Sequence, residues 1–463
     1  MTRTVVLRVA AVTAVVAASL TGSPGPAPPA SASHAGKPNV LFIITDDQRI
    51  ESMGPMRRTR SWFKRGGTEY VNAFVTTPLC CPSRASIFTG RYAHNHRVRT
   101  NADASELDQR STLQRYLKDD GYRTAIVGKY LNSWTGAPPH FEQWHTFENV
   151  SKYKGARFNS NGVVHKVKKY STDYIANRAR GLVRQFELTD TKPWFLVVST
   201  WAPHTPAQAA KRHRNSKVGQ WTGNPAVFEA DRTDKPAYVQ AKSAGFKGGR
   251  RLRERQLRTL KAVDDVVERL FTTLSELGEA NQTLAFFLSD NGIMWAEHGM
   301  KSKTTPYTPA IKVPFFVRWP GHVPQKVADP RIAANIDIVP TVLEAAGIEP
   351  DPEFPLDGRS VLGAEARDRL LLELTGGNNQ IDAPTWASTL TPAYQYVEYY
   401  DDVSGAVTFR EYYDLINDPF QLENVLADPD PANDPPLDEQ SNLGLQLARD
   451  RRCTGTDGLE PCP

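Results

Sequence analysis

The sequence has 463 residues, 40% of them hydrophobic, and a formal net charge of +5 at pH 7. This length suits one large domain with a smaller one, and the apolar content is sufficient for a sizeable core. The charge is too small to indicate nucleic-acid binding by itself, although a mildly positive chain suits an anionic substrate.

Residues 1–32 are typical of a secretory signal peptide. A positively charged start precedes the uncharged apolar run Val9–Leu20, and Ala30-Ser31-Ala32 offers small residues for cleavage. The alternative, a membrane anchor, is disfavoured because the run is too short to span a bilayer, and no later stretch is long and apolar enough. We therefore expect a secreted, extracellular protein without stable membrane association, in which residues 33–37 form a spacer.

Strand and helix patterns alternate through residues 38–349, which we expect to form the catalytic domain. Buried strands are predicted at Val40–Thr45, Arg123–Val127, Trp194–Thr200, Thr283–Ser289 and Pro314–Trp319. Helices are predicted at Thr112–Asp120, Thr172–Glu187, Arg253–Leu277 and Ile338–Ala346. This alternation predicts an α/β fold with a mostly parallel sheet and helices on both faces. Ligands bind such folds at the carboxyl ends of the strands.

The segment Ser243–Arg258, before and within the longest predicted helix, is rich in Lys and Arg. We favour a solvated loop and helix start over a lid that faces the substrate.

Residues 350–440 are rich in Pro and Asp and predict a small C-terminal α+β subdomain. Antiparallel strands are expected at Leu370–Leu374, Ala393–Tyr399 and Arg410–Leu415. Residues 441–463 form a tail in which Cys453 and Cys462 are separated by eight residues, a spacing that favours a local disulfide in an exported protein. Four cysteines allow three pairings, so the sequence alone does not exclude a bridge from Cys80 or Cys81 to the tail.

Two predicted strands end in acidic or amide residues. Asp46-Asp47 follows the first, and Asp290-Asn291 follows the strand at 283–289. Either pair alone is typical of a turn or a helix cap. Together, at the same edge of a sheet, they form a set of hard oxygen ligands suited to Ca²⁺ or Mg²⁺. Three clustered carboxylates without a cation would repel one another.

The run Cys80-Cys81-Pro82-Ser83-Arg84 has two interpretations. It is either a structural cysteine near a helix start or a nucleophile at a helix N-terminus, where the dipole favours an anion. Followed by Thr89-Gly90-Arg91, it resembles the signature of the sulfatases, a family with an alkaline-phosphatase-like fold. The resemblance implies that a formylglycine-generating enzyme converts Cys80, and not Cys81, to formylglycine, whose hydrated aldehyde is the nucleophile.

Other segments resemble this family in the same order along the chain: Asn39–Asp47, Gly128-Lys129-Tyr130, Ala202–Pro206, Lys303 with Ile311–Pro314, Asp337–Thr341 and Tyr413-Asp414-Leu415. The resemblance implies a metal site, Ca²⁺ with Mg²⁺ as the alternative, formed by Asp46, Asp47, Cys80, Asp290 and Asn291. It also implies that Lys129 and Lys303 bind the sulfate, that Arg84 holds the hydrated aldehyde, and that His204 protonates the leaving alcohol or contacts the sulfate. His298 is a weaker second candidate for that acid.

One position departs from many arylsulfatases, which carry a His two residues after the first active-site Lys. Here Lys129 is followed by Tyr130-Leu131-Asn132, which resembles N-acetylglucosamine-6-sulfatases and heparan endosulfatases, as do the doubled cysteine and His94-Asn95-His96. The departure implies a sulfated amino sugar, makes Asn132 a candidate substrate-binding residue, and leaves open which residue replaces the missing His.

A sulfate ester is an anion, so its hydrolysis needs positive groups around the sulfate oxygens. We therefore expect a sulfatase acting on a sulfated small molecule or glycan, with no nucleic-acid partner. The alternatives are a phosphonate monoester or phosphodiester hydrolase of the same superfamily, and a catalytically dead exported protein that binds sulfated glycans.

Overall fold

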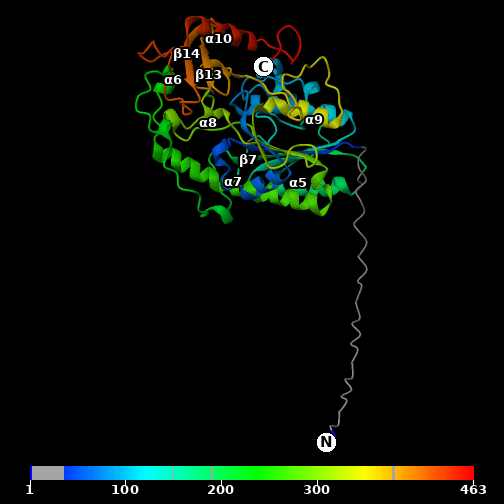
Figure 1. The fold of residues 1–463 in the computed structure, drawn as a ribbon. Coiled ribbons are helices and arrows are strands. Elements are labelled where there is room, and N and C mark those ends of the chain that lie inside the picture. Colours follow the sequence, from blue (N-terminus) through cyan, green and yellow to red (C-terminus); the bar gives the residue numbers. More distant parts are fainter. Residues whose placement is uncertain (3–35, 150, 189–190, 378–380) are drawn as a thin grey trace. The chain divides into compact units, whose positions relative to one another are not determined.

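A ten-stranded sheet runs through the protein in the computed structural model (Figure 1), in the order β10-β2-β9-β8-β1-β7-β3-β4-β5-β6. The structure describes residues 1–2, 36–149, 151–188, 191–377 and 381–463. The run Val9–Leu20 of the predicted signal peptide lies outside them. The strands are β1 (Asn39–Asp46), β2 (Gly67–Phe74), β3 (Arg123–Gly128), β4 (Gln143–Phe147), β5 (Arg157–Ser160), β6 (Val163–Lys166), β7 (Trp194–Pro203), β8 (Thr283–Ser289), β9 (Phe315–Arg318) and β10 (Val327–Ala334).

The central strands β8, β1, β7, β3 and β4 pair in parallel, which confirms the predicted mostly parallel α/β fold. Every residue of β1 and β8 is buried. Helices cover both faces of the sheet, so these strands carry continuous apolar runs instead of an alternating pattern.

Helices form a layer on each side of the sheet. One core joins it to α1 (Arg57–Gly66), α5 (Ser171–Glu187) and α7 (Phe246–Glu276). The opposite core contains α2 (Cys80–Thr89), α4 (Leu113–Asp119) and α9 (Ile338–Ala346). Figure 1 shows α5 and α7 together on one side of the strands and α9 on the other. The short helices are α3 (Ala93–His96), α6 (Ala237–Gln240) and α8 (Thr308–Ile311).

Helix α7 begins at Phe246, seven residues before the predicted start at Arg253, so most of the basic segment 243–258 is helix and not loop. Glycines at 248 and 249 disfavour a helix in isolation. Packing overrides this preference: a β-carbon on Gly249 would lie 1.8 Å from the carbonyl oxygen of Trp295, so only glycine allows this close approach.

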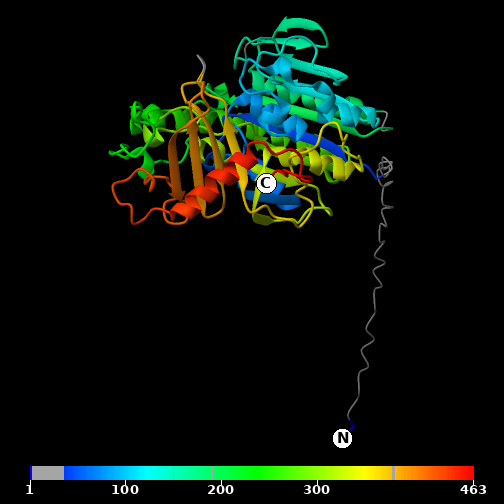
Figure 2. The same ribbon diagram turned by 90° about the horizontal axis from the view of Figure 1, so that it is seen from above.

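A second, antiparallel sheet lies in the C-terminal part of the chain. Its strands are β11 (Leu370–Leu374), β12 (Thr385–Leu390), β13 (Tyr394–Tyr400) and β14 (Val407–Asp414), in that order. Three of them were predicted, and β12 was missed. Figure 2 shows this sheet with helix α10 (Leu437–Asp450), also missed, lying along it. The domain limits expected at residues 349 and 440 remain predictions.

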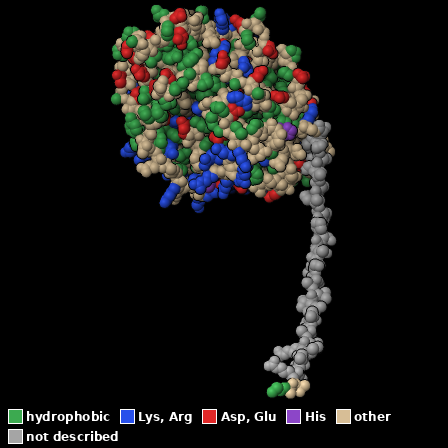
Figure 3. Space-filling view, in the orientation of Figure 1, with side chains coloured by type: hydrophobic (Ala, Val, Ile, Leu, Met, Phe, Trp, Pro, Cys, Tyr) green, Lys and Arg blue, Asp and Glu red, His purple; other side chains and the backbone are tan. Residues whose placement is uncertain are grey.

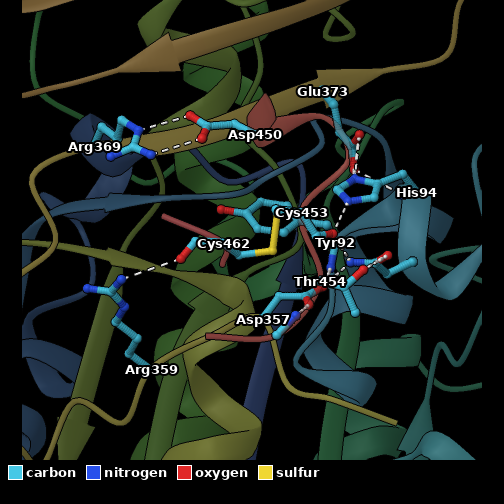
Figure 4. The surroundings of a disulfide bond; sticks show 12 residues. Tyr92, His94, Asp357, Arg359, Arg369, Glu373, Asp450, Cys453, Thr454 and Cys462 are labelled. Carbon is cyan, nitrogen blue, oxygen red and sulfur yellow. Dashed lines mark hydrogen bonds and ion pairs between the residues drawn. A yellow bond between two sulfur atoms is a disulfide. The ribbon is translucent and has the colours of Figure 1, made fainter. Parts of the chain in front are cut away.

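The disulfide Cys453–Cys462 (Figure 4), the pairing predicted from the spacing, closes a loop within the tail, and hydrogen bonds tie this loop to the rest of the fold. His94 Nε2 and Asn95 Nδ2 contact the Cys453 carbonyl oxygen at 3.0 and 2.9 Å. The buried carboxylate of Asp357 accepts hydrogen bonds from the backbone N–H groups of Tyr92 and Gly455.

Cys80 and Cys81 are free, so neither is bridged to the tail. Among the described residues, no helix combines the length and apolar character needed to cross a bilayer.

Candidate active site

The carboxyl ends of β1 and β8 bring the two acidic pairs together. The strands are in register from Asn39 to Thr45, so the residues that follow Thr45 and Ser289 are neighbours. The backbone N–H of Asp47 donates to Asp290 Oδ1 at 3.2 Å, and Asn291 Nδ2 donates to Asp47 Oδ1 at 2.7 Å. All four predicted oxygen-bearing residues are buried and converge at one point.

Cys80 is the first residue of α2, preceded by Leu79 in an extended conformation. Its Sγ lies 2.8 Å from Lys303 Nζ and 3.5 Å from Asp46 Oδ1. Burial raises the pKa of the Cys80 thiol to about 12, although Lys129 and Lys303 oppose this shift. An unmodified thiol at this position therefore stays protonated at neutral pH and is a weak nucleophile.

Arg84 lies one helical turn after Cys80 and is fully buried. Its Nε donates to Asp290 Oδ2 at 2.8 Å, and its Nη1 donates to Ser199 Oγ at 2.8 Å and to the Lys129 carbonyl oxygen at 3.0 Å. The guanidinium therefore fastens α2 to the ends of β8, β7 and β3. Its Nη2 has no hydrogen-bond partner among the described residues and lies 3.9 Å from Asp46 Oδ2.

The two predicted lysines converge on the same point from different directions. Lys129 follows β3, and its Nζ lies 2.6 Å from Asp46 Oδ2. Lys303 arrives from the loop between β8 and β9, and its Nζ contacts Asp47 Oδ1. Gly128, with φ of 111°, precedes Lys129, and a β-carbon there would lie 1.7 Å from the Ser199 carbonyl oxygen. Only glycine therefore allows β3 to end so close to β7.

The charged groups around Cys80 shift one another's pKa values. Burial alone would raise the pKa of the Asp46 carboxyl, but Lys129, His204 and Arg84 lower it well below its usual range. Burial and the neighbouring Asp46 charge raise the pKa of Asp290. Asp46 therefore holds its negative charge readily, whereas a second charge on Asp290 is disfavoured.

His204 follows the end of β7 and faces Asp47. Its Nδ1 lies 2.7 Å from the Thr205 carbonyl oxygen, which fits a protonated Nδ1 donating there, and its Nε2 lies 3.6 Å from Asp47 Oδ2. Its ring stacks on Trp201 with centroids 5.3 Å apart. His204 lines two cavities, of about 540 and 230 Å³. The imidazole therefore stands between the buried cluster and the space open to a ligand.

Asn132 lines the smaller cavity together with Trp134 and Trp201. Its Oδ1 is buried and has no hydrogen-bond partner among the described residues. This amide oxygen therefore retains an unused capacity to accept a hydrogen bond.

His298, the weaker candidate acid, lies elsewhere. It is 1% exposed, and its Nδ1 lies 2.9 Å from Glu229 Oε2. It lines neither cavity. The interpretation of His298 as a leaving-group acid is therefore not supported, because the Glu229 contact and burial keep it inside the loop.

A divalent cation fits the buried cluster. One ligand atom from each of Asp46, Asp47, Cys80 and His204 lies within 4.8 Å of the others. Asn291 Oδ1 is buried and has no hydrogen-bond partner among the described residues, as expected of an oxygen that serves as a metal ligand. Carboxylate and amide oxygens are the ligands that Ca²⁺ and Mg²⁺ prefer. His204 joins this group in the structure but was not among the predicted metal ligands.

Sequence reasoning missed several residues around the cavities. Lys242 and Lys301 line the larger cavity, and Trp201 lines the smaller one. Lys301 is two residues before Lys303, so the sequence could have predicted that it lies near the site. Lys242 and Trp201 gave no such signal, because their positions depend on how the loops fold back.

Comparisons with known proteins agree with this geometry. Residues 38–348 match the family model described as "Sulfatase", and residues 296–434 match "N-sulphoglucosamine sulphohydrolase, C-terminal". N-acetylglucosamine-6-sulfatase of Capra hircus is 31% identical over 87% of this chain and 82% of its own length. A Caenorhabditis elegans protein described as a putative extracellular sulfatase Sulf-1 homolog is 37% identical over 70% of this chain. The chain covers 48% of that relative's length.

Solved structures share the fold. A protein solved in complex with its substrate D-glucosamine-2-N,6-O-disulfate superposes with a TM-score of 0.79 at 20% identity, over 90% of this chain and 98% of that one. The two proteins therefore share their fold over most of both chains.

Proposed function

The chain belongs to the sulfatase family, and we propose that it hydrolyses sulfate esters of sulfated glucosamine, at the 6-O position, with a nucleophile made from Cys80. The observation that carries the proposal is the set of groups around Cys80 Sγ. Lys303 Nζ lies 2.8 Å away, Asp46 Oδ1 lies 3.5 Å away, and Arg84 follows one turn later in α2. A sulfate ester needs this combination of a nucleophile position and fixed positive charge.

We propose that Cys80 is converted to formylglycine by a formylglycine-generating enzyme before the protein acts. The hydrated aldehyde supplies one hydroxyl that attacks sulfur and a second that allows sulfate to be expelled as the aldehyde reforms. The buried, protonated thiol supports this proposal, because it would be a poor nucleophile in unmodified form. Arg84 Nη2 has no hydrogen-bond partner among the described residues, which supports a role for it in holding the diol.

The remaining side chains neutralise the charge of the sulfate and supply the proton for the leaving group. A cation held by Asp46, Asp47, Asp290 and Asn291, with Ca²⁺ favoured over Mg²⁺ by the family resemblance, supplies Lewis-acid stabilisation of the sulfate oxygens when bound. Lys129 and Lys303 hold positive charge where negative charge develops in the transition state. His204 uses Nδ1 to bond the Thr205 carbonyl, which leaves Nε2 to give a proton to the departing sugar oxygen.

The proposed substrate rests on the residues beyond the cluster and on the named relatives. Asn132 stands where many arylsulfatases carry a His, and it lines the smaller cavity. Trp134 and Trp201 add aromatic surface there, which suits a sugar ring. N-acetylglucosamine-6-sulfatases of Capra hircus and Homo sapiens are 31% and 30% identical to the chain, which supports a 6-sulfated glucosamine.

We also propose that the protein is secreted. Residues 1–32 read as a signal peptide, and the Sulf-1 homologues that it resembles are described as extracellular. Detection of the mature chain in the culture medium, beginning after Ala32, tests this point.

The activity is tested with three substrates presented side by side to protein co-produced with a formylglycine-generating enzyme. These are 6-sulfated N-acetylglucosamine, the same sugar sulfated at position 3, and a phosphonate monoester. We expect the largest kcat/KM for the 6-sulfate. A larger value for the phosphonate would assign the chain to the rival hydrolase class. Tight binding without turnover of any of the three would instead support a catalytically dead glycan-binding protein.

A further inference from the structure

The N-terminal half of α7 and the segment 205–220 form a basic track that the hydrolytic site does not use. Residues 205–220 contain four Lys and Arg and no acidic residue, and residues 246–261 contain seven Lys and Arg and one Glu. Together they carry a net charge of +10, whereas the whole chain carries +5. The rest of the chain is therefore net acidic, and the positive charge is concentrated here. Figure 3 shows Lys and Arg side chains gathered on the side of the molecule where Figure 1 labels α7 and α5.

The helix presents its basic residues in a row. Lys247, Arg251, Arg255 and Arg258 are spaced by four, four and three residues, which places them on one face of α7. This row is about 16 Å long at the usual helical rise. Lys247, Arg251 and Arg255 are exposed. A row of this kind presents regularly spaced charges to a long anion.

The segment 205–220 is fastened along the same row by backbone contacts. Arg255 donates to the Pro206 carbonyl oxygen, Arg258 to that of Ser216 at 3.1 Å, and Arg253 to that of Gly219 at 2.7 Å. Because Arg253 and Arg255 bond to neutral carbonyls, these contacts do not cancel their charges. Lys211, Arg214 and Lys217 are thereby held, exposed, beside the basic face of α7.

Acidic neighbours neutralise only part of the track. Arg212 pairs with Asp173 and Asp265, each at 2.7 Å, and Arg250 and Arg258 share Glu254 at 4.0 and 3.6 Å. Within the described part of the chain, ion pairs are absent at Lys211, Arg214, Lys217, Lys247, Arg251 and Arg255.

The track begins at the larger cavity. Ser243 and Ala244, just before α7, line that cavity, as does Thr205 at the start of the fastened segment. Lys301, another lining residue, packs on α7: a β-carbon on Gly248 would lie 3.3 Å from Lys301 Nζ. Positive charge therefore continues from the cavity wall onto the outer face of the helix. A partner bound on this track would be continuous with whatever occupies the cavity.

We infer that this track is a binding site for a sulfated polysaccharide, which holds the part of the glycan that extends beyond the sugar that reacts. The inference rests on the proposed function, because the cavity from which the track extends would hold a sulfated sugar. A glycan whose sulfates recur along its length matches a row of arginines, and release of its counterions adds affinity at low salt. Arginine suits this partner because its planar fork binds sulfate-like oxygens in pairs.

Binding, and not turnover, tests the inference, so failure of the hydrolytic proposal is distinguishable from failure of the track. The full chain carrying Cys80→Ala is titrated with fluorescent heparin-derived di-, hexa- and dodecasaccharides at several salt concentrations. The test variant adds Lys217→Glu and Arg251→Glu. The matched control adds Lys118→Glu and Arg452→Glu, two exposed residues outside the track that change the net charge equally. Thermal melting of each variant confirms that it is folded.

We expect affinity to rise with oligosaccharide length. The test variant should lose at least about tenfold in dodecasaccharide affinity and show a smaller salt slope, whereas the control should change by less than about twofold. Affinity that does not grow with length, or equal losses in both variants, would overturn the inference. A single-stranded oligonucleotide of matched length that binds as tightly, and is weakened as much by the test variant, would overturn the assignment to a sulfated glycan.

Discussion

Replacement of Lys303 by Met tests whether fixed positive charge at Cys80 drives the reaction. The side chains are similar in length, so the substitution removes the ammonium group while keeping most of the packing. Lys303 Nζ lies 2.8 Å from Cys80 Sγ, the atom whose position the proposed nucleophile takes. A sulfate bound to that nucleophile would therefore have its oxygens close to Nζ.

The expected loss of kcat follows from the short separation between the Lys303 ammonium group and the charge on the bound sulfate. Two unit charges about 4 Å apart interact by about 4 kcal/mol at an effective dielectric constant near 20. Part of this energy also stabilises the bound substrate and does not speed the reaction. We therefore expect kcat to fall by about 10²–10³-fold, the range found when one such donor is removed elsewhere.

The assay compares kcat and KM of Lys303→Met with those of the wild type on 6-sulfated N-acetylglucosamine, with the formylglycine content of both measured. Lys326→Met, at an exposed lysine between β9 and β10, is the control. Thermal melting separates loss of function from loss of fold. A variant with raised KM and unchanged kcat would refute the reasoning, because Lys303 would then bind the ground state and the transition state equally.

Three further predictions concern other residues. His204→Asn should lower kcat on a sugar sulfate by about 10²–10⁴-fold. It should lower kcat far less on an aryl sulfate, because the phenolate leaves without needing a proton; equal losses would exclude His204 as the acid. Burial alone would lower the pKa of His94, but Glu373, 3.0 Å away, raises it to about 9. The folded pKa exceeds the unfolded value of about 6.5, so the stabilisation is complete below pH 6.5 and lost as the pH rises through 9. The difference in melting temperature between wild type and His94→Gln should shrink over that window, and a constant difference would contradict the pairing. Cys453→Ser with Cys462→Ser should lower the free energy of unfolding by about 2–3 kcal/mol, measured by denaturant titration, because the bridge closes a short loop; an unchanged midpoint would show that the tail does not need it.

The large sheet was predictable because strands that are buried on both faces consist of continuous apolar runs. Strands such as Val40–Thr45 consist of apolar, β-branched residues and end in polar pairs. Strand β12 has no such run: it carries Ser388, whose hydroxyl is buried and accepts a hydrogen bond from Gln395 on the neighbouring strand. A polar residue satisfied across two strands reads as a loop in the sequence.

Helix α10 was missed for a related reason. Only Leu443, Leu447 and Asp450 are buried along it, so its apolar stripe is too narrow to stand out in a Pro- and Asp-rich region. The start of α7 was misplaced because Gly248 and Gly249 indicate a break, whereas close packing on the Trp295 backbone requires glycine at position 249.

The candidate site likewise contains residues whose positions the sequence predicted and residues whose positions it did not. Convergence of Asp46, Asp47, Asp290 and Asn291 followed from strand ends that meet at one edge of a sheet. The approach of His204 to Asp47 did not, because it depends on the bend after β7 and on the Nδ1 contact with Thr205. The position of Lys242 in the lining of the larger cavity also depends on loop geometry and has no counterpart in a local pattern.

The mass of the tryptic peptide Gly66–Arg84 tests the central claim most directly. Conversion of Cys80 to formylglycine replaces CH₂SH by CHO and lowers the peptide mass by about 18 Da, and fragmentation assigns the change to Cys80 or Cys81. Protein from the native host should carry the lower mass at Cys80, and sulfatase activity should rise in proportion to the converted fraction. A preparation with an intact Cys80 thiol and full turnover of a sulfate ester would contradict the account.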